Sequence, residues 1–108
     1  MAREVEFVVE INPFDRYRQK RLSSKGKILE FTAQYETNVG GRWLPVVRYD
    51  TAHGFFHKDV LHPSKKQEKI SMIARSYNEA LTFAREDIKK NWMRYKEAFL
   101  KEMKNYEN

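Results

Sequence analysis

Cysteine is absent from this chain of 108 residues, and its absence removes several classes of protein at once. Without thiols there is no disulfide bond, no thiolate nucleophile and no cysteine-based zinc site. A small secreted scaffold held by disulfides is therefore excluded, and the reducing cytoplasm is the expected location. The chain also lacks an apolar run near the roughly 20 residues that cross a bilayer, so no membrane partner is expected. Near its start, glutamates interrupt the apolar residues, so there is no continuous apolar segment and we expect no signal peptide.

Glycine and proline are scarce and unevenly placed. The chain has four glycines and three prolines, and neither type occurs after Pro63. The first two-thirds of the chain therefore predict strands and turns, and the last third predicts helix. No repeat, low-complexity tract or linker interrupts the sequence, so we expect a single domain over residues 1–108.

Alternation of apolar and polar side chains predicts several strands between residues 3 and 73. In the first of them, four apolar side chains share one face and three glutamates share the other, as in a half-buried strand. Turn signals at 38–41 and 51–54 separate later strands. The predicted strands are Glu4–Ile11, Lys27–Thr37, Arg42–Asp50, Phe55–Leu61 and, as one more short strand, Lys69–Ile73. The basic segment Arg16–Arg21 fits either an edge strand or a loop.

The last third predicts one helix over about residues 77–105. Ser76 and Glu79 fit a capping box, and apolar residues then recur every three or four positions. Such a helix measures about 42 Å, whereas a strand of six or seven residues spans about 20 Å. The helix should outrun the sheet, and the apolar side chains left uncovered predict a homodimer. They are Trp92, Tyr95, Phe99 and Met103. The predicted fold is α+β, an antiparallel sheet of four or five strands packed against one long C-terminal helix.

Basic residues outnumber acidic residues by 21 to 15, which gives a net charge of +6. The excess lies mainly in residues 1–27 and 52–75, and a concentrated basic surface is one feature of nucleic-acid-binding proteins. We predict nucleic-acid contacts from Arg16, Arg18, Lys20, Arg21, Lys58, Lys65 and Lys66. Tyr17, Phe55 or Phe56 would supply stacking on bases.

All three histidines lie within ten residues, at positions 53, 57 and 62. If a four-residue loop connects the strands on either side of them, four polar side chains share one face, with His53 beside them at the turn. These four are Arg48, Asp50, His57 and Asp59. A five-residue loop would instead place Arg48 and Lys58 opposite each other, and the pattern alone leaves the register open.

Two imidazoles, a guanidinium and a carboxylate are sufficient for RNA cleavage without a metal. One imidazole would take the proton of the ribose 2′-hydroxyl, and the guanidinium would stabilise charge on the phosphate. We therefore predict a catalytic site of Arg48, Asp50, His53 and His57, with neither metal nor cofactor. A divalent metal on His53, His57 and Asp59 is an alternative, although no fixed zinc spacing is present. A third interpretation is that these histidines only hold a turn.

The segment from Arg48 to Asp59 resembles the TumE-type toxins of prokaryotic toxin–antitoxin pairs. The matching residues are Arg48, Tyr49, Asp50, His53, Gly54 and His57. Thr51 replaces the usual asparagine, and Asp59 stands where a second histidine of an H-x-H strand would be. The resemblance implies a toxin directed at nucleic acid, with an antitoxin protein as its partner.

The sequence thus predicts a small basic toxin-like protein that acts on RNA as a metal-independent ribonuclease. The alternative is a non-catalytic domain that binds nucleic acid or a partner protein, in which the surface basic residues carry the affinity.

Overall fold

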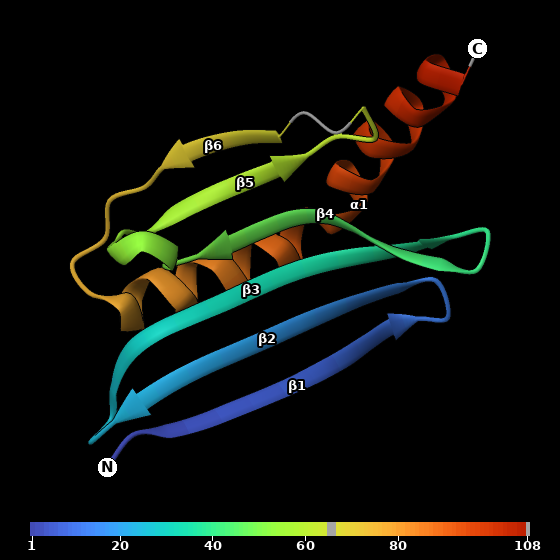
Figure 1. Ribbon diagram of the computed structural model, residues 1–108. Helices are drawn as coiled ribbons and strands as arrows, with labels where there is room; N and C mark the ends of the chain where they lie inside the picture. The colour runs from blue at the N-terminus through green and yellow to red at the C-terminus, as the bar shows by residue number, and fades with distance from the viewer. Residues whose placement is uncertain (65–66, 108) are drawn as a thin grey trace.

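A computed structural model describes residues 1–64 and 67–107. It contains one six-stranded antiparallel sheet and one long helix, and so confirms the predicted α+β fold (Figure 1). The strands lie side by side in their order along the chain. They are β1 (Arg3–Asn12), β2 (Asp15–Ser24), β3 (Lys27–Val39), β4 (Arg42–Asp50), β5 (His57–Leu61) and β6 (Gln67–Ser71). The helix is α1 (Tyr77–Glu107), and a short 3-10 turn, η1 (Ala52–Gly54), connects β4 to β5.

The strand that the sequence left unresolved is β2, and it brings the sheet to six strands. It is neither an edge strand nor a loop, because it pairs with β1 on one side and β3 on the other. Its central residues are mostly charged, so hydrophobic alternation could not reveal it. The charges alternate instead, since Arg16, Arg18 and Lys20 all point to the same face.

The helix covers only one face of the sheet, against β3 and β4 (Figure 1). Apolar side chains of these two strands meet one stripe of α1, and Tyr35 packs against Trp92 with ring centroids 5.8 Å apart. The buried core comprises Phe31, Ala33, Tyr35, Val46, Val47, Tyr49, Phe56, Ala80, Leu81, Ala84, Ile88 and Phe99. We call the opposite face, which carries the alternate residues of every strand, the open face.

The predicted single helix is confirmed, with 31 residues. At its start the Glu79 amide donates to the Ser76 hydroxyl at 3.1 Å, which is one half of the predicted capping box. The other half differs, because the Glu79 carboxylate accepts from the amide of Arg75. Within residues 1–64 and 67–107, no helix has the length and apolarity needed to cross a membrane.

The expected exposure of the helix end is wrong. Phe99 is buried, and Trp92, Tyr95 and Met103 are partly buried against the core. The reason is strand length, because β3 has 13 residues and reaches about 43 Å at 3.3 Å per residue. At 1.5 Å per residue the helix measures about 46 Å, so the sheet nearly matches it.

Candidate functional site

The connection between β4 and β5 decides which side chains meet on the open face. Six residues, Thr51–Phe56, form this connection, so neither predicted loop length is correct. The register pairs Asp50 with His57 and Arg48 with Asp59. Six, like four, is an even number of loop residues, so alternation along the strands puts the same side chains on one face as the four-residue loop would. These are Arg48, Asp50, His57 and Asp59.

His57 is buried between two carboxylates. Its Nε2 atom lies 2.7 Å from Asp50 Oδ1 and 3.5 Å from Asp59 Oδ2. Its Nδ1 atom lies 3.3 Å from the carbonyl oxygen of Phe55, whose ring packs beside the imidazole. The side chain is only 1% exposed. A general base must come within about 3.2 Å of the atom that bears the proton it removes, so this burial is unfavourable for direct contact with an RNA phosphate or ribose.

The other two histidines lie apart from this pair. His53 is exposed in η1 with φ of 67°, and among the described residues it makes no side-chain hydrogen bond or ion pair. His62 lies 2.7 Å from a carboxylate oxygen of Glu102, and so connects the end of β5 to the helix. The three histidines are close in sequence, but the structure does not bring them into one cluster.

Two arginines bind a single carboxylate in the middle of the open face, and a third arginine is connected to it through a glutamine. Arg16 and Arg18 donate to Glu36 at 2.5 and 3.3 Å. Arg48 donates to the side-chain oxygen of Gln34 at 2.6 Å, and the Gln34 amide in turn donates to Glu36. Burial alone would raise the pKa of Glu36, but the bonds from Arg16 and Gln34 outweigh it, so the pKa is lowered. We call these five residues the arginine network.

The aromatic side chain of Trp43 borders the arginine network, and no sequence pattern indicated it. The guanidinium of Arg16 lies over the ring of Trp43, 3.9 Å from its centroid. Alternation along β2, read as charge rather than as hydrophobicity, was the signal that could have placed Arg16 and Arg18 on one face. The contribution of Trp43 depends on the pairing of β3 with β4, which no local pattern reveals.

The remaining predicted basic residues are divided between the two faces. Lys20 lies on the open face and pairs with Glu4 at 3.1 Å. Arg21 points to the other face by strand alternation. Lys58 also lies on the helix side, where its ammonium group donates to the Tyr95 hydroxyl at 2.7 Å, and burial lowers its pKa. The predicted contacts from Lys65 and Lys66 lie outside the described residues.

The aromatic residues predicted to stack on bases are also dispersed. Phe56 is part of the buried core, and Tyr17 packs at its margin on the helix side. Phe55 is 40% exposed beside His57. Of the three, only Phe55 has a large free surface.

The fold and its polar face define a small α+β protein whose sheet is covered on one side by a single helix. Residues 2–105 match a family described as a domain of unknown function (DUF7718), and the chain belongs to that family. No curated protein and no solved structure matches it.

The family match corrects the resemblance to TumE-type toxins, and the expected antitoxin partner loses its basis with it. The motif has a local explanation. Asp50 accepts the amide of Ala52 at 2.9 Å and contacts His57, while Gly54 adopts a φ of 81°. Positive φ favours glycine, so much of the shared pattern describes a hairpin loop rather than a toxin.

Proposed function

We propose that this protein binds single-stranded RNA through the open face of its sheet. The observation that supports this proposal is the arginine network, in which Arg16 and Arg18 bind Glu36 directly and Arg48 is connected to it through Gln34. The network itself carries three positive charges and one negative charge on the neighbouring strands β2, β3 and β4. Glu10 and Asp59 lie opposite Arg16 and Arg48 on the same face. Arginine binds phosphate oxygens in a bidentate manner, and phosphate contacts supply much of the affinity of proteins for nucleic acids.

The shape and chemistry of the open face also support an RNA ligand. The single helix lies on the other side, so an extended strand of RNA can follow the sheet surface. Unpaired bases stack on aromatic rings and on guanidinium planes, and Trp43 with Arg16 offers both. An RNA ligand agrees with the cytoplasmic location expected from the absence of cysteine.

Binding is favoured over cleavage because of the burial of His57. With this imidazole enclosed by Asp50, Asp59 and Phe55, the geometry supports the non-catalytic alternative better than the predicted ribonuclease. Electrophoresis of labelled RNA incubated with the protein tests this choice. We expect intact RNA, and cleavage that disappears in His57→Ala would restore the ribonuclease interpretation.

Binding itself is tested by removing the charges of the arginine network. The variant Arg16→Gln/Arg18→Gln/Arg48→Gln is compared with Lys89→Gln/Lys90→Gln/Lys101→Gln, which loses the same charge from exposed positions on α1. Fluorescence anisotropy with a short single-stranded RNA at two salt concentrations measures affinity. We expect the arginine variant to bind at least about tenfold more weakly, with a salt slope that is smaller by about two. Equal losses in both variants, or no binding by the unaltered protein at low salt, would overturn the proposal.

A further inference from the structure

We propose a second site on this protein, a divalent metal site formed by Asp50, His57 and Asp59. Each of these side chains offers one ligand atom, and the three atoms lie within 4.8 Å of one another. Asp50 and His57 are direct partners across β4 and β5, and Asp59 follows two residues later on the same face. The site is independent of RNA binding and can be tested without RNA.

The carboxylate of Asp59 is the strongest indication that this cluster binds a cation. The side chain is buried at 3% exposure, and its Oδ1 atom has no hydrogen-bond partner among the residues that the structure describes. The other oxygen has only the 3.5 Å contact with the imidazole. Arg48 lies opposite on β4, but it donates to Gln34 instead. A buried carboxylate without donors is costly, and a metal ion is one of the few groups that compensates it.

The surroundings of the His57 imidazole also favour a bound cation. Neutral histidine carries one N–H. If that hydrogen is on Nε2, the bare Nδ1 faces the carbonyl oxygen of Phe55, and if it is on Nδ1, the bare Nε2 faces two carboxylates. A cation at Nε2 removes this conflict. In a metal complex Nδ1–H donates to Phe55 while the Nε2 lone pair binds the ion, and the metal-free counterpart is an imidazolium that donates from both nitrogens. Histidines that bind metals usually have such a backbone partner on their second nitrogen.

The ligand set selects the class of ion. One imidazole nitrogen and two carboxylate oxygens suit first-row divalent metals such as Zn²⁺ and Mn²⁺, and two carboxylates neutralise the charge of the ion. Metal–ligand bonds of about 2.0–2.2 Å place neighbouring ligand atoms about 3 Å apart. The observed distances of 2.7 and 3.5 Å from Nε2 bracket that separation.

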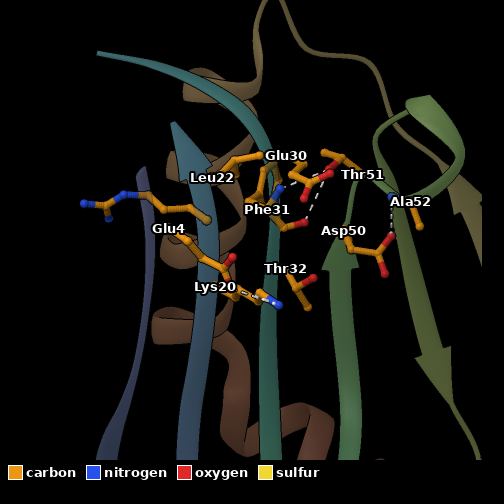
Figure 2. A pocket seen from close by; sticks show the side chains of 10 residues that line it. Glu4, Lys20, Leu22, Glu30, Phe31, Thr32, Asp50, Thr51 and Ala52 are labelled. Carbon is orange, nitrogen blue, oxygen red and sulfur yellow. Dashed lines mark hydrogen bonds and ion pairs between the residues drawn. The ribbon is translucent and has the colours of Figure 1, made fainter. Parts of the chain in front are cut away.

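An ion can reach the site through a hollow of about 190 Å³ at the ends of the strands (Figure 2). Asp50 lines this hollow together with Thr32 and Lys20, and its side chain remains 13% exposed. Asp50 therefore connects the hollow to the enclosed His57 and Asp59, and water in the hollow can fill the coordination positions that the protein leaves free.

Calorimetric titration of EDTA-treated and dialysed protein with Zn²⁺ and, separately, Mn²⁺ tests this proposal. We expect one equivalent of at least one of these ions to bind and to raise the melting temperature. Asp59→Asn and Asp50→Asn should each weaken binding by at least tenfold. Asp59→Asn should melt at or above the temperature of the metal-free unaltered protein, because it removes a buried charge that has no hydrogen-bond donor. That measurement shows that the variant folds.

The control is His62→Gln, which removes the other histidine that lies between carboxylates. Its two ring nitrogens face different residues, Glu102 and Glu68, so it does not form a single ligand cluster. We expect metal binding within twofold of the unaltered protein and a metal-dependent shift of the His57 Nε2 resonance. No binding at millimolar metal, or binding that survives Asp59→Asn but is lost in His62→Gln, would overturn the proposal.

Discussion

Asp15 shows how single residues of this fold stabilise a buried charge. It is fully buried at the start of β2, where it accepts a hydrogen bond from the Tyr35 hydroxyl at 2.6 Å and another from the Lys96 ammonium group at 2.8 Å. Burial alone would raise its pKa, but these bonds outweigh the cost of burial and lower it. Asp15 thus connects β2, β3 and α1, and nothing local in the sequence distinguishes it from a surface aspartate.

The pH dependence of stability follows from three such carboxylates. The pKa values of Asp15, Glu36 and Asp87 are all lowered in the folded protein, in spite of burial, by hydrogen bonds from neighbouring side chains. A lowered native pKa contributes stability above the unfolded value and loses it as the pH falls through the native value. We expect the free energy of unfolding, measured in urea, to fall steeply below about pH 4 as these three carboxylates become protonated.

Asp15→Asn is the matched variant for this pH dependence. It keeps the size of the side chain but cannot titrate, so its unfolding free energy should be lower at neutral pH and should change less between pH 5 and 3. An equally steep acid dependence in this variant would show that Asp15 contributes nothing to it.

Replacement of Trp43 should distinguish the contribution of base stacking from the contribution of charge to RNA binding on the open face. Replacement of an aromatic residue that stacks on a base costs about 1–3 kcal/mol of binding free energy. We therefore expect Trp43→Ala to weaken RNA affinity by about fivefold to a hundredfold while the salt slope stays unchanged, as measured by anisotropy. Trp43→Phe is the control that keeps a stacking surface. A reduced slope in Trp43→Ala would mean that the ring acts only by positioning Arg16.

Among the elements, the start of α1 is tied to the β2–β3 turn by one side chain. Asn78 accepts the amide of Ile28 at 2.9 Å and donates to the carbonyl oxygen of Gly26 at 3.0 Å. Gly26 lies in the turn before β3, and Ile28 is the second residue of β3. Asn78 and Ile28 are 50 residues apart in the sequence, and the contact between them fixes the start of the helix over the sheet.

Loss of this contact should loosen the turn without unfolding the sheet. We expect Asn78→Ala to lower the free energy of unfolding by no more than about 1 kcal/mol for each of the two hydrogen bonds, because the site is exposed. Hydrogen exchange of the Ile28 amide should accelerate, whereas amides in the middle of β3 should keep their protection. Thr82→Ala, one turn further along α1, should leave the Ile28 amide unchanged.

At the scale of the whole molecule, the elongated shape follows from matched lengths. The principal extents are 50, 28 and 21 Å, and the long strands and α1 share the longest direction (Figure 1). Because the helix packs mainly on β3 and β4, the apolar side of β1 stays partly open, with Val9 and Ile11 exposed. A groove of about 410 Å³ at the β1–β2 turn adds Phe14 and Met93 to this exposed apolar surface.

Homodimerisation stays a prediction, but its expected surface moves to this groove. Phe14 and Met93 are 60% and 61% exposed. Of the helix residues first expected to mediate the dimer, Phe99 is buried and Trp92, Tyr95 and Met103 are partly buried. We expect light scattering to give the mass of a dimer at high micromolar concentration, and Met93→Glu to give a monomer of 13.0 kDa. Lys89→Glu, an exposed change on the same helix, should remain dimeric. A monomeric unaltered protein would refute the prediction.

The sequence alone determined the features that depend on local periodicity. The helix follows from a 3.6-residue apolar repeat and a serine cap, and most strands follow from strict alternation. The α+β class needed nothing more. For the hairpin, the sequence left two registers open, and only an even number of loop residues places Arg48, Asp50, His57 and Asp59 on one face.

Only the tertiary structure decided what those side chains can do. Burial of His57 depends on how the η1 loop folds over the sheet, and the arginine network depends on the pairing of β2, β3 and β4. Lys58 was assigned to a nucleic-acid surface from its charge, yet strand alternation directs it toward α1. Pairing register and burial are set by contacts between residues distant in the sequence, and the free energy of a charged side chain depends on those contacts more than on its immediate neighbours.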